Sequence, residues 1–151
     1  MVAWAEFAEA EPELSARVVG LFTAHRHHTM ASIRRDGSPR ISGTEVTLED
    51  GQLVLGMMPG TRRADDLRRD PRMAIHSHSV DPPEPDQGTW PGEAKVSGRA
   101  HPKPPGASGP SDADWFRIDI SAVVLTRLGD PADHLLIESW TEGRGYRSER
   151  R

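Results

Sequence analysis

Two adjacent arginines after a turn form the part of this sequence best suited to bind an anion. Arg62 and Arg63 directly follow Pro59-Gly60, at the expected first turn of a helix. A cation at a helix N-terminus opposes the helix dipole and costs about 0.3–1 kcal/mol. The free N–H groups of that turn, together with two guanidinium groups, would instead form a concentrated anion site. The apolar segment 52–58 would place an apolar wall beside it, so the pattern suits a flat ligand that carries a phosphate.

The alternative interpretation is a solvated surface helix. Arg62 and Arg63 could pair with Asp65 and Asp66 at positions i+3 and i+4. These pairs run in the less favourable orientation and contribute about 0.2–0.5 kcal/mol each. They would only partly offset the unfavourable dipole term, and both interpretations stay open at this point.

Five of the seven histidines fall in two short segments, 24–29 and 75–79. His76 and His78 are two residues apart, so on a strand they would share a face and could bind a metal or haem. The other three are His25, His27 and His28. They follow a helix C-terminus, where positive charge is favourable, so their position needs no ligand to explain it. We expect capping or packing roles, one of His76 and His78 facing a ligand cleft, and no metal site.

Other chemistry has little support. The chain has no cysteine, which excludes thiolate nucleophiles and disulfides. No G-x-S-x-G segment marks a nucleophilic serine, and no catalytic residue is assigned. In a chain with only 5% aromatic residues, tryptophans are needed for packing. We therefore expect core or interface positions for Trp90, Trp115 and Trp140.

Composition predicts one domain over residues 1–151, with 1–12 and 141–151 as peripheral tails. The net charge of −4 comes from 23 acidic and 19 basic residues, which argues against nucleic acid or an acidic membrane as a partner. The low apolar content of 35% favours a core completed by a second subunit, hence a homodimer. The N-terminus is acidic rather than signal-like, and no apolar run approaches the roughly 18 residues of a membrane span. A cytoplasmic location is expected.

The elements that must position the arginines are mostly strands. Apolar spacing after Pro12 predicts a leading helix to about Ala24, and Pro71 ends a second helix near Arg69. A bulge is expected near Gly43, and a bulge or close approach at Gly98. Alternation and turn residues predict strands at 29–34, 40–48, 52–58, 72–79, 93–101, 115–128 and 134–140, with loops at 80–92 and 102–112. This pattern favours a small antiparallel barrel with helical caps.

Four segments carry a resemblance to a known family. They are "MASIRRDGSPRISGTE" (30–45), "TRRADDLRRDPRMA" (61–74), "GEAKVSGRAH" (92–101) and "VVLTRLGDPADHLLIESW" (123–140). In order and spacing they resemble the pyridoxamine 5'-phosphate oxidase-like flavin-binding split-barrel family, over residues 13–140. The resemblance implies a mainly-β split barrel of about six antiparallel strands with a leading helix and one short inserted helix. It also implies a homodimer with a flavin in each of two interface clefts.

The family's binding motifs map onto individual residues here. Its Ser-Arg-Lys phosphate segment matches Thr61, Arg62 and Arg63, where arginine in the third place keeps the charge. Its flavin-lining arginine matches Arg40. The resemblance therefore implies a set of cofactor-binding residues: Arg40, Ile41, Ser42, Gly43, Met57, Met58, Thr61, Arg62, Arg63, His76 and Glu93.

The C-terminal end departs from the family enzymes. These carry an Arg-x-His segment for their pyridoxal phosphate substrate, whereas residues 138–151 contain no histidine, so pyridoxamine phosphate is not the expected substrate. The resemblance implies a flavin-dependent oxidoreductase with FMN. One alternative is a reductase that uses the deazaflavin coenzyme F-420, whose anionic tail could lie on Arg34, Arg35, Arg68 and Arg69. Another is a non-catalytic flavin or haem binding protein.

Overall fold

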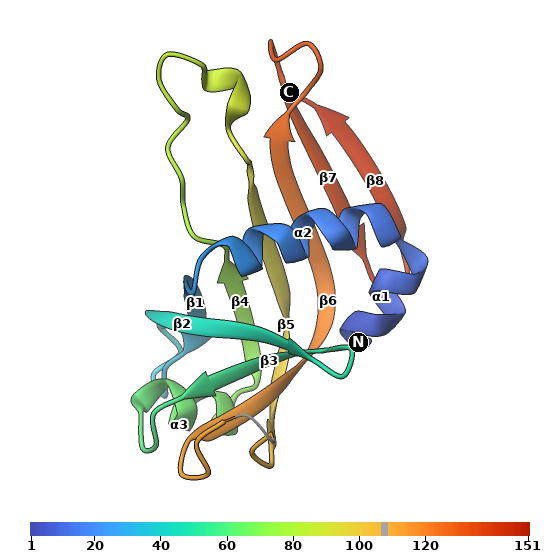
Figure 1. The fold of residues 1–151 in the computed structure, drawn as a ribbon. Coiled ribbons are helices and arrows are strands. Elements are labelled where there is room, and N and C mark those ends of the chain that lie inside the picture. The colour runs from blue at the N-terminus through green and yellow to red at the C-terminus, as the bar shows by residue number, and fades with distance from the viewer. Residues whose placement is uncertain (107–108) are drawn as a thin grey trace.

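The protein is described here by a computed structural model that covers residues 1–106 and 109–151. It is mainly β, with six antiparallel strands closed into a barrel and two further strands outside it (Figure 1). The barrel order is β3-β2-β1-β4-β5-β6, and β3 pairs with β6 to close it. The barrel strands are β1 (His27–Ile33), β2 (Pro39–Glu49), β3 (Gln52–Met57), β4 (Arg72–His76), β5 (Glu93–Lys103) and β6 (Asp114–Leu128).

The first three strands form the antiparallel meander expected from the sequence. Two tight turns join them, and each contains a glycine with positive φ, 84° at Gly37 and 72° at Gly51. The bulge expected at Gly43 is absent, because β2 pairs with β1 without a break from Pro39 to Glu45. That prediction was wrong. A Cβ at Gly43 would meet nothing within 4 Å. A larger side chain would therefore fit here, and the glycine leaves an open space beside the strand.

Gly98 does mark an irregularity, as expected. The register of β5 against β6 shifts between Ser97 and Gly98. A Cβ at Gly98 would lie 2.1 Å from the carbonyl oxygen of Asp119, so only glycine permits this approach of the two backbones. Beyond the bulge, β6 continues past the barrel, where residues 122–128 pair with β7 (Leu135–Thr141).

The N-terminal residues belong to the core, which corrects the expected peripheral tail at 1–12. They form α1 (Trp4–Ala10), in which Trp4 is 2% and Phe7 is 0% exposed. The Phe7 ring packs against Trp140 of β7, with ring centroids 5.1 Å apart. Burial of two large aromatic side chains stabilises the fold by a few kcal/mol, so this short helix is part of the fold.

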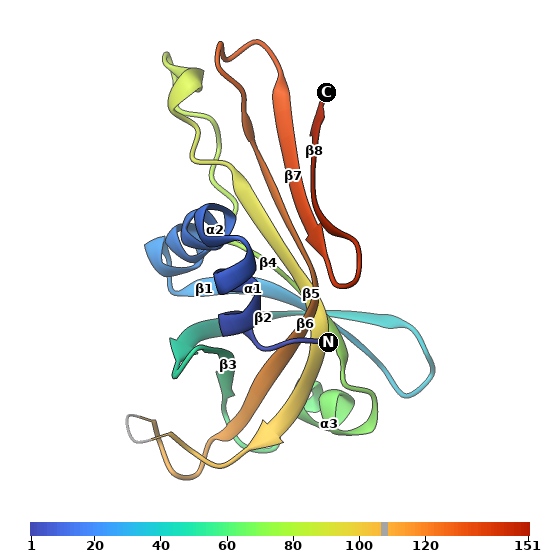
Figure 2. The same ribbon diagram turned by 90° about the vertical axis from the view of Figure 1, so that its right-hand side faces the viewer.

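The expected C-terminal tail contains an additional edge strand, β8 (Gly145–Arg150), which pairs with β7. Most of its side chains are exposed. The predicted leading helix is α2 (Pro12–Ala24), which buries Leu14, Val18 and Phe22 against the barrel. Figure 2 shows α2 crossing one side of the barrel while β7 and β8 extend beyond it.

The inserted helix α3 (Arg62–Arg69) lies at the lower end of the barrel (Figure 1). The hydroxyl of Thr61 caps it by accepting the Ala64 N–H at 3.3 Å, a role for which threonine is a preferred residue. Ala64 and Leu67 are buried in the core, so the helix covers the open end of the barrel. A short 3-10 turn at Gln87–Thr89 lies in the long loop after β4. Within the described residues no helix is long and apolar enough to cross a membrane.

Candidate functional site

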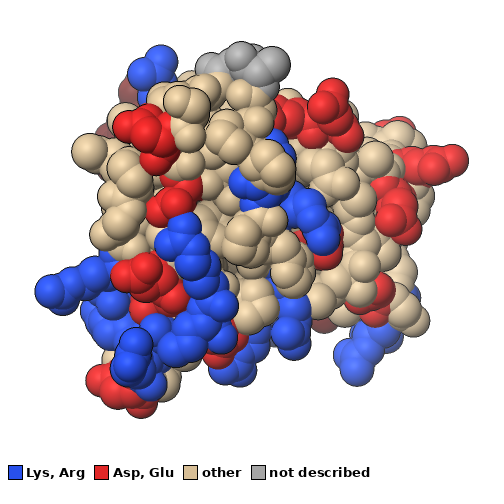
Figure 3. All heavy atoms as spheres, turned by 90° about the horizontal axis from the view of Figure 1, so that it is seen from below, with Lys and Arg blue, Asp and Glu red and all other residues tan. Residues whose placement is uncertain are grey.

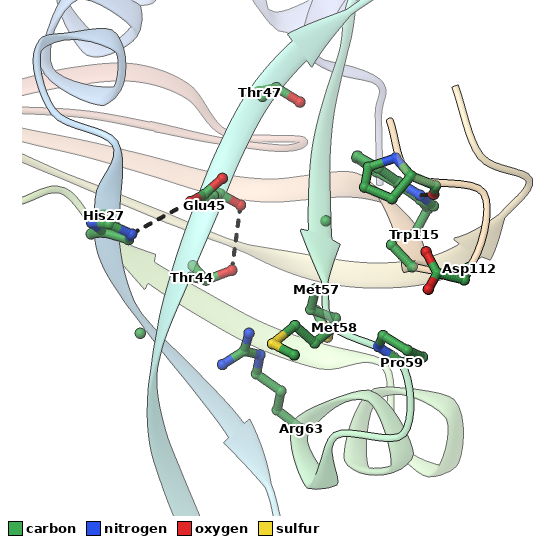
Figure 4. A pocket seen from close by; sticks show the side chains of 14 residues that line it. His27, Thr44, Glu45, Thr47, Met57, Met58, Pro59, Arg63, Asp112 and Trp115 are labelled. Atoms are coloured by element: carbon green, nitrogen blue, oxygen red, sulfur yellow. Dashed lines mark hydrogen bonds and ion pairs between the residues drawn. The ribbon is translucent and has the colours of Figure 1, made fainter. Parts of the chain in front are cut away.

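The main pocket is a groove of about 440 Å³ on the outside of the β1–β2–β3 meander. Its volume falls in the range of about 300–1,000 Å³ that is usual for small-molecule sites. The N-terminus of α3 forms one end, and the start of β6 forms another wall (Figure 4). The residues that line it are His27, Gly43, Thr44, Glu45, Thr47, Gly56, Met57, Met58, Pro59, Arg63, Pro110, Asp112, Ala113 and Trp115.

Arg63 is the cationic side chain at the α3 end of the main pocket. It extends from α3 toward β2, with the Met58 side chain beside it (Figure 4). Its Nε atom is buried and has no hydrogen-bond partner among the described residues. Burying a charged donor without an acceptor is costly. An anionic group bound in the main pocket would be placed to supply that acceptor.

Gly43 supplies a bare stretch of strand in the pocket lining. With no side chain at this position and nothing within 4 Å of where a Cβ would stand, the backbone of β2 is open to the pocket. Met57 is buried beneath, only 4% exposed, whereas Met58 is 76% exposed at the rim. A flat ring can therefore lie against this backbone with thioether contacts at its edge.

Arg62 points elsewhere, into a second concavity that we call the arginine pocket. Consecutive helical residues are separated by about 100° around the axis, so neighbours do not face one side. The arginine pocket also measures about 440 Å³ and is lined by Arg34, Arg35, Asp36, Arg40, Arg62, Asp65, Asp66 and Arg69. Figure 3 shows Lys and Arg side chains gathered over one part of this lower face. The two arginines of the sequence motif thus serve different sites.

The buried carboxylate of Asp66 organises the arginine pocket. It accepts hydrogen bonds from Arg40 Nε at 2.6 Å, Arg69 at 3.0 Å and the Ser32 hydroxyl at 3.2 Å. Burial alone would raise the pKa of Asp66, but these three donors outweigh it and hold the pKa below its usual range. Arg40 is therefore engaged by a carboxylate, and the alternative pairing of Arg62 or Arg63 with Asp66 does not occur.

The turn that leads into α3 is held by a second carboxylate. Asp114, at the start of β6, accepts the Gly60 N–H on Oδ2 at 3.2 Å and pairs with Arg68 through Oδ1. The guanidinium of Arg68 also lies over the Phe116 ring, 5.8 Å from its centroid. Asp114 and Phe116 thus hold both the turn before α3 and its last turn against β6, and so position Arg63.

The sequence-derived residues therefore divide among several places. Gly43, Met57, Met58 and Arg63 line the main pocket, and Arg40 and Arg62 line the arginine pocket. Thr61 caps α3. The remaining four line neither pocket: Ile41 is 75% exposed on β2, Ser42 is its half-buried neighbour, and His76 and Glu93 pair with each other at 3.3 Å on the outside of β4 and β5.

Several pocket residues were not expected from the sequence. His27 and Glu45 face each other across β1 and β2, 3.4 Å apart, and Trp115 lies opposite Gly56 in the β3–β6 pairing. Trp115 was expected in the core or an interface, but of the three tryptophans considered only Trp140 is buried, at 8% exposure. Side chains alternate along β2, so Gly43, Glu45 and Thr47 share its outer face. This alternation could have identified Glu45 and Thr47 from the sequence as neighbours of Gly43 in the pocket.

The histidines do not share a metal site in the structure. Strand β4 ends at His76, and the His78 ring turns away to stack on His25 at 4.1 Å. In the part of the chain that the structure describes, no three His, Cys, Asp or Glu side chains are grouped to hold a metal ion. His28 is buried beside this stack. Its Nε2–H donates to the Phe22 carbonyl at 2.9 Å, and its Nδ1 accepts the His78 N–H at 3.0 Å.

Because His28 is held neutral, stability should fall in mild acid. Burial lowers the pKa of His28 from its ordinary value of 6.5, so below that pH the unfolded chain takes up a proton that the folded chain excludes. We expect the free energy of unfolding to decrease as the pH falls from 7.5 to 5.5. The decrease should be smaller in His28→Gln, and urea unfolding at both pH values measures the difference. An equal decrease in both proteins would contradict this role of His28.

Comparison with solved structures assigns the fold. A pyridoxamine 5'-phosphate oxidase-related, FMN-binding protein from Nostoc punctiforme aligns over 96% of both chains, with a TM-score of 0.60 and 14% identity. An F420 reductase aligns over 64% of this chain and 87% of its own, with a TM-score of 0.50 and 14% identity. HutZ, the haem storage protein of Vibrio cholerae, aligns over 74% of this chain and 90% of its own, with a TM-score of 0.54 and 12% identity.

The chain therefore has the split-barrel fold of the pyridoxamine 5'-phosphate oxidase-like proteins. This confirms the fold expected from the sequence motifs. No protein-family model and no curated protein matches the sequence. The three solved structures are named for different ligands, so the choice among them depends on the residues of this chain.

Proposed function

We propose that this protein is a flavin-dependent oxidoreductase that binds FMN in the main pocket. The observation that supports this most directly is the buried Nε of Arg63, which lacks an acceptor at the end of the pocket. A phosphate is a suitable acceptor, because a guanidinium binds it through two parallel, charge-assisted hydrogen bonds. In this proposal Arg63 and the N-terminus of α3 hold the phosphate. The bare backbone at Gly43, flanked by Met57 and Met58, supports the ring.

The redox chemistry would belong to the cofactor. When bound, FMN supplies a ring that accepts hydride at N5 and passes electrons onward. The residues of this chain bind and orient that ring, and the apolar side chains of Met57 and Met58 limit the access of water to it. Hydride transfer requires no acid or base from the protein, so we assign no catalytic residue. The proposed location is the cytoplasm.

We also propose that a second copy of the chain covers the outer face of the sheet. Ile41 is 75% exposed there, and small side chains continue the face across the neighbouring strands. Ala31 pairs with both Ile41 and Ala74, and Ala74 pairs with Ser97. An exposed isoleucine beside a row of small side chains suits close approach of a second copy through a two-fold interface. Light scattering during size-exclusion chromatography should give twice the mass of the chain.

A deazaflavin is the second candidate, and the arginine pocket favours it. Arg35 and Arg62 line that pocket and make no ion pair among the described residues. Two free guanidinium groups on one side of α3 could attract the anionic tail that coenzyme F-420 carries beyond its phosphate. Arg62→Met should then weaken binding of coenzyme F-420 while leaving FMN binding little changed. A non-catalytic flavin or haem carrier is the remaining alternative.

The absorbance spectrum of the purified protein, followed by addition of reduced nicotinamide, tests the proposal. Flavin bands that bleach with reduced nicotinamide and return in air would support an FMN oxidoreductase. Flavin bands that persist under reductant would indicate a carrier, and a deazaflavin spectrum would favour the second candidate. A Soret band would indicate haem. Failure of added FMN to bind the colourless protein would contradict the proposal.

Gly43→Val should block the main pocket without destabilising the fold. The backbone at Gly43 is extended, and a side chain there meets no protein atom within 4 Å. A β-branched residue also suits an exposed strand position. We expect FMN affinity to fall at least tenfold while the melting temperature of the FMN-free protein stays the same or rises. Fluorescence titration and thermal unfolding measure the two effects, with Gly20→Ala in α2 as a control that leaves FMN affinity unchanged.

A further inference from the structure

Trp115 forms the wall of the main pocket at the end away from His27 (Figure 4). It lies at the start of β6 and pairs with Gly56 of β3, where the barrel closes. A Cβ at Gly56 would come within 2.7 Å of Cζ3 and 2.9 Å of Cη2 of the Trp115 ring. Glycine at position 56 therefore allows the indole to lie directly on the backbone of β3.

Two further contacts restrain the indole. Its Nε1–H donates to the carbonyl oxygen of Pro110 at 3.1 Å, and the ammonium of Lys103 lies 6.0 Å from the ring centroid. Lys103 is itself anchored to the carboxylate of Glu49, 3.3 Å away. Trp115 is half-buried, so a large aromatic surface is held in one place and still borders the pocket.

We infer that the Trp115 end of the main pocket is a subsite for a planar, conjugated ring of the substrate. Pro110, whose carbonyl oxygen accepts the indole N–H, also lines the pocket and offers apolar surface next to the indole. Aromatic rings pack on one another in offset or edge-to-face geometry. This inference rests on the proposed function, because it takes the Arg63 end of the pocket as the place of the cofactor and the Trp115 end as the place of the substrate.

A pair of probes with one carbon skeleton tests the inference. The planar probe is 2-naphthol, and decahydro-2-naphthol is its saturated, puckered counterpart. Aromatic contacts contribute about 0.5–1.5 kcal/mol beyond the burial of area, which corresponds to an advantage of roughly 2- to 12-fold in Kd. We expect the wild-type protein to prefer 2-naphthol by about this factor in isothermal titration, whether or not FMN is present.

Three variants test whether the preference depends on the indole ring of Trp115 and on where that ring is held. Trp115→Leu should abolish the preference for 2-naphthol, and Trp115→Phe should keep most of it. Gly56→Ala keeps the tryptophan but should reduce the preference, because the new Cβ displaces the indole. Trp90→Leu is the matched control, since Trp90 lies in the loop after β4 and donates its Nε1–H to Val80 at 2.7 Å. It should bind both probes as the wild type does.

The outcomes distinguish this inference from the proposed function. An equal preference in the wild type and in Trp115→Leu would overturn the subsite while leaving FMN binding intact. Displacement of 2-naphthol by FMN would also overturn it, because the Trp115 end would then belong to the cofactor. If FMN fails to bind and the preference for 2-naphthol persists, the proposed function fails and the planar-ring subsite stands.

Discussion

Replacing Arg63 with Met is expected to weaken FMN binding by roughly 10- to 150-fold, since a hydrogen bond to a charged group contributes about 1.5–3 kcal/mol. Met is unbranched and apolar, so it fills much of the same space without the charge. The quenching of flavin fluorescence on binding measures the Kd. Riboflavin, which has no phosphate, should bind Arg63→Met about as well as it binds the wild type.

Arg62→Met is the matched control for this prediction. Arg62 is the adjacent residue of the same helix turn, but it is exposed and lines the arginine pocket. Its removal should change FMN affinity by less than about threefold, as expected for a screened surface charge. In Arg63→Met the free energy of unfolding should stay the same or rise, because a buried donor without an acceptor is removed. Equal losses of FMN affinity in the two variants would contradict the assignment of Arg63.

Asp66→Asn is expected to cause the largest loss of stability, about 3–5 kcal/mol. The side chain of Asp66 is only 4% exposed, and its carboxylate neutralises Arg40 and Arg69. Without it, Arg40 of β2 and Arg69 of α3 lose the carboxylate with which both form their ion pairs. Urea unfolding measures the loss. Asp65→Asn, at a side chain that is 68% exposed, should change stability by less than about 0.5 kcal/mol.

The effect of Asp66→Asn should also depend on pH. Because its hydrogen-bonded partners hold the pKa of Asp66 below the usual value of 3.8, the folded protein gains stability from this group above that pH. The gain is lost as the pH falls through the lower pKa of the folded state. The difference in unfolding free energy between the wild type and Asp66→Asn should therefore be constant near neutrality and shrink below about pH 4. A difference that stays constant down to pH 2 would show that the charge of Asp66 is not responsible.

The barrel strands were predictable because each has its own signal in the sequence. Alternation of side chains, glycine turns and Pro71 located β1 to β4 and the end of α3. α1 gave a weak signal, since its seven residues bury only Trp4 and Phe7. β8 gave none, because backbone hydrogen bonds to β7 hold a strand whose side chains are polar and exposed.

The sequence located the candidate anion-binding residues as a group, but it did not show into which pocket each side chain points. The sequence placed Thr61, Arg62 and Arg63 at a helix start, where Thr61 does cap the helix. It did not reveal that Arg40 pairs with Asp66, because a contact over 26 residues depends on how α3 packs on the barrel. Nor did it reveal Trp115, whose place in the pocket depends on the closure of β3 against β6 and on the bare backbone of Gly56.

The most direct test of the central claim compares FMN with riboflavin on the wild-type protein. Both carry the same ring, and only FMN carries the phosphate that Arg63 is proposed to bind. We expect FMN to bind at least tenfold more tightly than riboflavin at low ionic strength, with an advantage that decreases as salt is added. Equal affinities for the two, or no binding of either, would contradict the claim that Arg63 and the start of α3 form the phosphate site of a flavin.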